Sequence, residues 1–134
     1  MRTKLVAAVV LVIGALPVLA AETSTERLPD PVGFAASQAI PATLSLNVSP
    51  KGRDARMTPV YDNYRPKVVF DGREVVCMFE LESVKSLAPG GSAAVSLECK
   101  EPVEVYRAAT RFTVLEGHKK VGHVDVQLPR AATK

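Results

Sequence analysis

Two cysteines and two histidines are the side chains of this 134-residue sequence with the clearest capacity for metal chemistry. Cys77 and Cys99 lie outside any CxxC motif, and no HxxxH pattern stands near either of them. His118 and His123 are five residues apart across an expected turn, where they could bind a metal or respond to pH. Because no third ligand is evident, we expect two solvated histidines, no metal site and no cofactor.

Ser92 is the residue that most resembles a catalytic nucleophile. It follows Gly90 and Gly91, which is how a nucleophile elbow begins. The closing glycine is missing, however, and the expected context is a turn entering a strand rather than a strand–turn–helix. No Ser/His/Asp order and no paired carboxylates with a plausible cleft occur elsewhere. The sequence therefore predicts a protein that is not an enzyme and has no catalytic residues.

Basic residues alternate with two tyrosines after residue 50. Such a stretch can bind single-stranded nucleic acid or an acidic protein face. The alternative is a folded loop in which Tyr64 and Arg65 pack and pair with Asp54 or Asp62. We do not expect nucleic acid, because predicted export separates the chain from it. An unidentified protein partner remains open, since long loops on rigid barrels often carry binding. The candidate partner-binding residues are Arg53, Arg56, Tyr61, Tyr64, Arg65 and Lys67.

The first 20 residues have the three parts of a secretory signal peptide. Arg2 and Lys4 give a basic start, residues 5–16 carry no charge, and small residues precede a cleavage site after Ala20 or, as the alternative, Ala21. An apolar run of about 15 residues is short for a bilayer, which needs roughly 20. We therefore expect a periplasmic or secreted protein that meets the membrane only through this transient segment.

Cleavage also changes the charge of the chain. It removes two of the 17 basic residues and none of the 14 acidic ones, which leaves a net charge of about +1. A near-neutral protein exerts no general attraction on nucleic acid. Residues 21–41 contain Pro29, Pro31 and Pro41 and are expected to form a flexible leader. The domain is expected over 42–129, followed by a tail of residues 130–134.

From residue 42 onward the apolar residues recur with the period of a β-strand. Leu44, Leu46 and Val48 alternate with polar residues, and turn signals such as Asp71-Gly72 separate such segments. The expected strands contain residues 44–48, 68–70, 75–81, 93–99, 112–114 and 124–126. The sequence thus predicts an all-β fold, a small closed antiparallel barrel of about six strands, since closure removes exposed edges.

The same alternation places both cysteines on the inner face of their strands. Cys77 shares a face with Phe79, and Cys99 shares one with Leu97. An internal disulfide between the two strands is therefore geometrically plausible, and an exported chain favours it. The bridge would contribute roughly 3 kcal/mol in the chain-entropy model. Two buried thiols would leave the same sequence pattern and remain the alternative.

Five short motifs occur in order between residues 58 and 122. They are Thr58-Pro59-Val60-Tyr61-Asp62-Asn63-Tyr64-Arg65-Pro66, Pro89-Gly90-Gly91, Glu101-Pro102-Val103, Arg111-Phe112-Thr113-Val114-Leu115-Glu116-Gly117 and Val121-Gly122. Residues 42–129 resemble the C-terminal β-barrel domain of elongation factor Tu. The five motifs match, in this order, the TPF-aromatic-xx-YRP stretch, the PGD turn, the HPI or HPV element, the RFAIREG segment and the final VG of that domain.

The resemblance implies a six-stranded antiparallel barrel. In the family this domain helps to bind the T-stem of aminoacyl-tRNA and a nucleotide-exchange factor. The GTPase domain has no counterpart here, since no GxxxxGK[ST] loop is present, and GTP is not expected. The family's basic loop before TPF is replaced by Asp54-Ala55-Arg56-Met57, and the second glycine of each pair is lost after Gly117 and Gly122. These departures argue against close approach to RNA.

Two functions follow from these observations. The first is an exported, non-catalytic binding module that contacts a protein through the loop of residues 50–66 or an exposed barrel face. The alternative is a translation-factor-like binder of RNA or protein that stays inside the cell, which requires that the N-terminal segment does not export it.

Overall fold

The computed structural model describes residues 28–49, 51 and 53–130, and in this part of the chain all regular structure is β-strand. The strands are β1 Val32–Phe34, β2 Ala39–Leu46, β3 Lys67–Phe70, β4 Arg73–Leu81, β5 Ser92–Cys99, β6 Val103–Val105, β7 Arg111–Glu116 and β8 Lys119–Val126. The predicted signal peptide and both of its cleavage sites lie outside the described residues.

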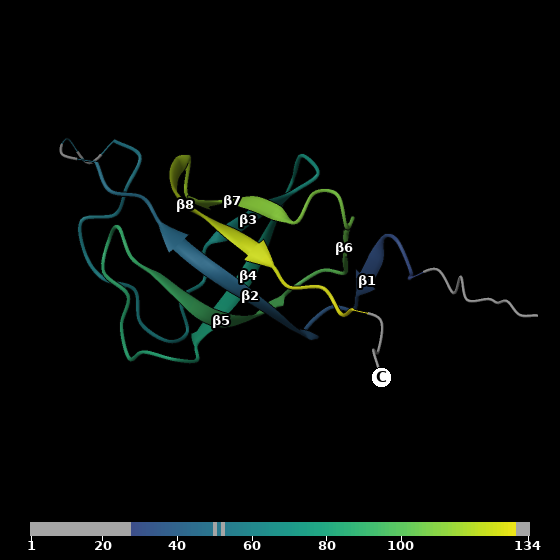
Figure 1. Cartoon of the computed structure of the whole chain (residues 1–134). Helices are drawn as coiled ribbons and strands as arrows, with labels where there is room; N and C mark the ends of the chain where they lie inside the picture. The colour runs from purple at the N-terminus through teal and green to yellow at the C-terminus, as the bar shows by residue number, and fades with distance from the viewer. Residues whose placement is uncertain (1–27, 50, 52, 131–134) are drawn as a thin grey trace, which may run out of the picture.

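Six of the strands form a closed antiparallel barrel in the order β2-β5-β4-β3-β7-β8 (Figure 1). The predicted fold class, an all-β barrel of six strands, is therefore confirmed. Alternation gives the barrel its filled interior, because every second residue is buried along β2, β3 and β5. In β5, for example, Ala93, Val95 and Leu97 point inward while Ser92 and Ala94 stay exposed. Side chains such as Phe79 fill the interior completely, and each contributes about 1.5–3 kcal/mol by burial.

The predicted flexible leader of residues 21–41 is wrong over its second half. The barrel begins at Ala39 rather than at residue 42, and Pro41 lies inside β2. Proline is tolerated there because its missing N–H falls at the end of the ladder with β8. Its carbonyl accepts a hydrogen bond of 2.9 Å from the backbone N–H of Gln127, just beyond β8.

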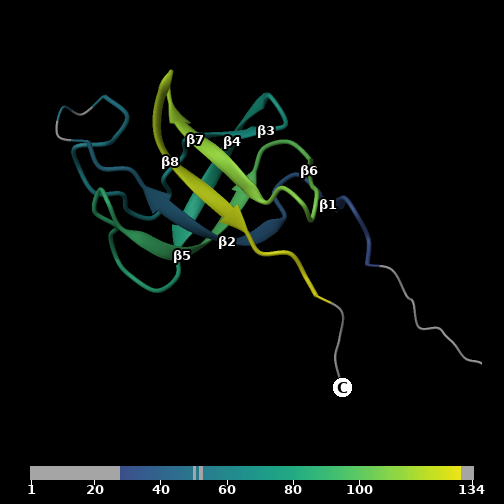
Figure 2. The same cartoon turned by 45° about the horizontal axis from the view of Figure 1, so that its top comes forward.

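A second, two-stranded ribbon made of β1 and β6 lies at one end of the barrel (Figure 2). Phe34 of β1 and Val103 and Val105 of β6 are buried and belong to the same apolar cluster as the barrel interior. Their strands are only three residues long, too short for their period to stand out in the sequence. This explains why the sequence analysis missed both.

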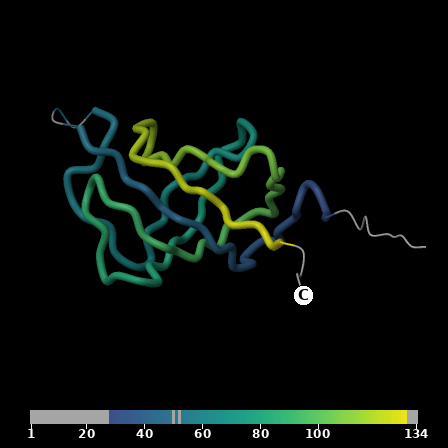
Figure 3. The backbone as a smooth tube through the Cα atoms, viewed as in Figure 1, coloured from purple at the N-terminus to yellow at the C-terminus, as the bar shows by residue number. Residues whose placement is uncertain are grey.

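Arg107 ties the two ends of the described chain together beside this ribbon. Its guanidinium donates 2.9 Å hydrogen bonds to the carbonyls of Pro29 and Pro129, and its backbone N–H donates to the Asp30 carboxylate at 2.8 Å. The tube in Figure 3 shows the chain after β8 ending close to the segment that leads into β1.

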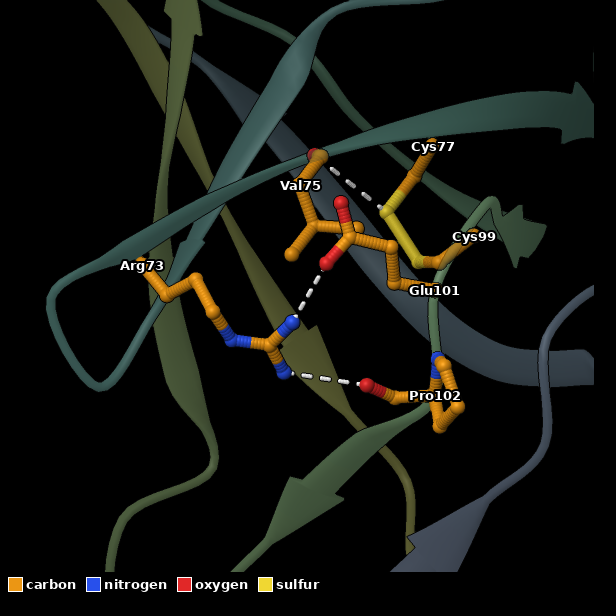
Figure 4. The surroundings of a disulfide bond; sticks show 6 residues. All are labelled: Arg73, Val75, Cys77, Cys99, Glu101 and Pro102. Atoms are coloured by element: carbon orange, nitrogen blue, oxygen red, sulfur yellow. Dashed lines mark hydrogen bonds and ion pairs between the residues drawn. A yellow bond between two sulfur atoms is a disulfide. The ribbon is translucent and has the colours of Figure 1, made fainter.

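The predicted disulfide between Cys77 and Cys99 is confirmed, and the alternative of two buried thiols is set aside. The two residues lie directly opposite each other on β4 and β5, and both are buried (Figure 4). The bridge spans 22 residues and accounts for both cysteines of the sequence. Because both cysteines are buried, the bond acts as a structural cross-link of the barrel wall.

Gly122 permits the close crossing of β8 over β2. Its partner on β2 is Leu46, and a Cβ atom placed on Gly122 would lie only 2.2 Å from the backbone oxygen of Ser45. A β-bulge between Val114 and Leu115 of the neighbouring β7 falls at the same level. Side chains of any size therefore collide with the backbone at this point.

We predict that Gly122→Ala destabilises the protein by about 1–3 kcal/mol, the usual cost of overpacking, because backbone cannot move aside as a side chain can. Urea unfolding followed by circular dichroism measures the loss. Gly33→Ala is the matched control, since nothing lies within 4 Å of its added Cβ. Equal stability of the two variants would contradict the close crossing.

Candidate partner-binding surface

The loop between β2 and β3, residues 47–66, lies at the end of the barrel opposite the β1–β6 ribbon (Figure 1). It is fastened to the β4–β5 loop by a pair of backbone hydrogen bonds between Val60 and Leu87, of 2.8 and 2.9 Å. Lys119, the first residue of β8, reaches in from the other side and donates to the Ala55 carbonyl at 3.2 Å. This loop is therefore held on both sides.

The second half of the loop runs along β4 as an irregular extension of β3. The N–H of Phe79 donates to the Tyr64 carbonyl at 2.7 Å, and the N–H of Asn63 donates to the Phe79 carbonyl at 3.0 Å. Asn63 has a φ of 67°, a conformation that asparagine tolerates better than most residues. The Asp62 carboxylate accepts from the N–H of Leu81 at 2.7 Å, which ends the extension.

Arg56, Tyr64 and Glu116 form a partly buried cluster beneath the loop. Both the Arg56 guanidinium and the Tyr64 hydroxyl donate to the Oε2 atom of Glu116. The Arg56 guanidinium also lies 5.0 Å from the centre of the Tyr64 ring. It donates further to the Thr58 carbonyl at 3.1 Å and to the Pro59 carbonyl at 3.3 Å. The cluster thus joins the loop, the β3 extension and the end of β7.

Burial and the neighbouring carboxylate both act on the protonation of this cluster. Burial of the phenol, followed by its hydrogen bond to Glu116 and the charge of Glu116, raises the pKa of Tyr64 well above its usual 10.0. For Arg56, burial alone lowers the pKa, but the Glu116 carboxylate outweighs it and the net shift is upward. Tyr64 therefore stays a neutral donor and Arg56 a cation at physiological pH.

The structure separates the six candidate binding residues into two groups. Arg56 and Tyr64 are held by Glu116, and Lys67 lies 3.5 Å from the Glu74 carboxylate. Exposed side chains are found at Arg53, Tyr61 and Arg65.

The sequence analysis expected Tyr64 and Arg65 to pair with Asp54 or Asp62 in a folded loop. That prediction is wrong. Tyr64 does pack in the loop, but it pairs with Glu116, which lies 52 residues further along the chain. Arg65 does not pair with a carboxylate in the described part of the chain and instead lies 4.0 Å from the Met78 sulfur. Only the register of β7 against β3 brings Glu116 to this position, and no local sequence pattern reveals it.

Large apolar side chains are exposed at this same end of the barrel. Val48 is 73% exposed, Met57 72% and Tyr61 61%, and Val84 of the β4–β5 loop is 42% exposed. We call these four residues the loop-end surface. The sequence analysis predicted Val48 as a strand residue in line with Leu44 and Leu46, which is wrong. β2 ends at Leu46, where the backbone turns to pair with Gly90 and Gly91.

The two histidines are not brought together. His118 lies in the β7–β8 turn, whereas His123 pairs opposite Thr113 within the sheet. Its Nε2 atom is 3.9 Å from the Asp125 carboxylate. Among residues 28–49, 51 and 53–130, no group of three or more metal-ligating side chains occurs. The Ser92 hydroxyl is 2.8 Å from that of Ser45 and lies at the first residue of β5.

No known protein-family model matches this chain. Within the part of the chain that the structure describes, no helix is long and apolar enough to cross a membrane.

We predict that Tyr64→Phe lowers the free energy of unfolding by about 1–2 kcal/mol at neutral pH, because it removes a hydrogen bond to a charged group. Urea unfolding measures this loss. Tyr61→Phe is the control, because its ring is exposed and its change should be small.

The raised pKa of Tyr64 makes the stability of the protein depend on pH. Since folding raises the Tyr64 pKa above 10.0, the unfolded chain loses its phenolic proton first. The stabilisation from Tyr64 is therefore complete below pH 10 and declines above it. Wild type should lose more stability than Tyr64→Phe as the pH rises from 10. Parallel curves for the two proteins would contradict the raised pKa.

Proposed function

We propose that this chain is an exported, non-catalytic β-barrel module that binds a protein partner through the loop-end surface. The exposure of Val48, Met57, Tyr61 and Val84 at one end of the barrel carries the proposal. Exposed apolar residues gathered on one surface commonly mark sites of protein contact. Tyrosine and methionine are also among the residues enriched in such interfaces.

The anchoring of the loop supports a binding role. Its contacts with β4, the β4–β5 loop and the start of β8 hold the backbone in place before a partner arrives. A surface that is ordered in advance loses less conformational entropy on binding. Arg53 lies in the same loop and is exposed, so it can add a charged contact at the rim.

The Arg56–Tyr64–Glu116 cluster argues against a nucleic-acid surface. Binding of single strands needs free aromatic faces and unpaired cations along one groove. Tyr64 and Arg56 are engaged with Glu116, and Lys67 lies beside Glu74. Of the six candidate residues, this leaves Arg53 and Arg65 as unpaired cations in the described part of the chain. Two cations attract a nucleic-acid backbone only weakly.

Export is supported by the disulfide together with the signal-like N-terminus. Disulfides form and persist in oxidising compartments and are rare in the cytosol. Both cysteines of the chain are used in the Cys77–Cys99 bridge. A periplasmic or secreted location is therefore part of the proposal.

The relationship to elongation factor Tu also stays a proposal. A six-stranded barrel agrees with the architecture that the resemblance implies. Small barrels of this kind occur in proteins of many functions, so the fold alone does not carry the relationship. Any such origin would be a barrel reused for another purpose, without GTP and without the tRNA contacts of translation.

Export is tested by the intact mass of the natively expressed protein from separated cell compartments, with and without reductant. We expect a periplasmic or extracellular species that begins at Ala21 or Glu22 and gains the mass of two hydrogens on reduction. A full-length, reduced cytoplasmic species would sink the proposal and favour the alternative, an intracellular binder. Transfer RNA and elongation-factor partners would then be tested first.

Partner contact is tested by placing a photoreactive benzophenone amino acid at position 61 and irradiating intact cells. A discrete protein adduct is expected, and its yield should fall at least severalfold in a second variant that also carries Met57→Ser. Position 100 is the matched control, since Lys100 is exposed but follows β5 at the other end of the barrel. Equal adducts at both positions, or none at position 61, would exclude the loop-end surface.

A further inference from the structure

Four exposed cations surround the loop-end surface. They come from three segments that meet at this end of the barrel: the loop of residues 47–66, the β4–β5 loop and the start of β8 (Figure 1). Within the described part of the chain, none of the four makes an ion pair. We call these four residues the loop-end cations: Arg53, Lys85, Lys119 and Lys120.

The β4–β5 loop holds Lys85 beside Tyr61. Val60 and Leu87 pair through two backbone hydrogen bonds of 2.8 and 2.9 Å. Tyr61 follows the first of these residues, and Lys85 precedes the second by two positions. In an antiparallel bridge, the residues that follow one partner lie opposite those that precede the other. Because Val84 is the next residue along this loop, an ammonium group and two exposed apolar side chains share this side of the surface.

The start of β8 holds two lysines on the other side of the surface. The ammonium group of Lys119 donates to a backbone carbonyl of the loop at 3.2 Å. The N–H of Asn47 donates to the Val121 carbonyl at 2.9 Å. The same antiparallel rule therefore brings Lys120, which precedes Val121, toward Val48, the first apolar residue of the surface.

The carboxylates at this end do not balance the cations. The Asp62 carboxylate accepts from the N–H of Leu81 at 2.7 Å, so it is turned toward β4. Asp54 and Glu82 are exposed and lie in the same two loops as the cations. The remaining carboxylate, Glu116, is engaged within its own cluster beneath the loop. The apolar loop-end surface is therefore bordered by an excess of positive charge.

We infer that the partner of the loop-end surface offers an acidic segment, in which aspartate or glutamate flanks aromatic or aliphatic side chains. The apolar side chains of that segment pack on Met57 and Tyr61, and its carboxylates contact the loop-end cations. The inference rests on the proposed function and names the chemistry of the partner that this surface takes.

The position of the remaining carboxylates selects a protein over an anionic membrane. A lipid surface of this kind carries negative charge throughout, so it repels the exposed carboxylates of Asp54 and Glu82. A protein face can place a donor opposite each of them. A second copy that paired through the same surface would bring a second set of loop-end cations toward the first, and like charges across an interface are unfavourable.

The experiment selects peptides from a phage-displayed library of random dodecapeptides on the oxidised full chain. We expect enriched peptides in which acidic residues flank aromatic or aliphatic ones. The synthetic peptides are then irradiated with the variant that carries benzophenone at position 61 and with the control variant that carries it at position 100. An adduct at position 61 alone locates the peptide on the loop-end surface.

The affinity of the peptides is measured for Lys85→Gln/Lys120→Gln, which leaves Lys119 in place because that residue also holds the loop. The matched control is Lys100→Gln/Arg130→Gln, which removes the same charge from exposed residues beyond the ends of β5 and β8. We expect the first variant to bind about fivefold more weakly or worse at low salt, and the control to stay within about twofold of wild type.

Salt separates the charge effect from a change in packing. Raising the salt concentration from about 0.05 to about 0.5 M should weaken the binding of wild type and remove most of its advantage over the variant, because exposed charges are screened. An advantage that persists at high salt would contradict a contact made by charge.

Other results would overturn the inference. They are the failure to enrich any peptide, the enrichment of basic or purely apolar peptides, and equal binding to the variant and its control. Binding of the full chain to phosphatidylglycerol vesicles that is lost in Lys85→Gln/Lys120→Gln would assign the surface to a lipid. A molar mass that rises with protein concentration in wild type, and not in this variant, would assign it to a second copy.

The inference and the proposed function fail in different ways. A discrete adduct at position 61 in cells, formed with a partner segment that contains no acidic residue, would overturn the inference and leave the proposed function standing. The absence of any adduct at position 61 in cells would overturn both.

Discussion

The pairing of β2 with β8 is the interaction on which the remaining structure depends. These are the first and last strands of the barrel, and their contact converts an open sheet of six strands into a closed one. Residues as far apart as Thr43 and Gln127, 84 positions along the chain, meet across this pair. Closure removes the two free edges that an open sheet would expose. Gly122 makes the closure possible, because any Cβ atom there would meet the backbone of Ser45.

The loop that carries the proposed partner contact begins directly beyond this closing pair. The N–H of Asn47 donates to the Val121 carbonyl at 2.9 Å, and the N–H of Leu46 donates to the Gly91 carbonyl at 2.9 Å. The chain therefore leaves β2 in a fixed direction between β8 and the β4–β5 loop. The Arg56–Tyr64–Glu116 cluster fixes the other half of the same loop. The exposed side chains at this end include Val48, Met57, Tyr61 and Val84. Large apolar side chains of this kind suit a protein partner better than a charged polymer.

The sequence determined the parts of the fold that depend on local alternation. In β5 the inward set of Val95, Leu97 and Cys99 follows from period two alone, and the same parity placed Cys77 on the inner face of its own strand. Errors occurred where tertiary contacts override the pattern. Val48 continues the alternation of β2 but lies past the end of that strand, because the backbone has turned toward Gly90.

Long-range contacts also explain what the sequence left undetermined in the candidate site. The six basic and aromatic residues were identified by composition, yet their division into held and exposed groups depends on Glu116, which arrives from another strand.

The packing of the barrel explains why the proposed partner-binding surface lies at its rim. The interior is filled by side chains such as Phe79, Ile40 and Leu97, which are fully buried, and a filled barrel of this size leaves no room for a ligand. The Cys77–Cys99 bridge lies within that interior, where neither thiolate nor reductant has ready access. A buried bridge is poorly suited to serve as a redox switch and well suited to brace the wall between β4 and β5. Recognition is therefore left to side chains outside the wall.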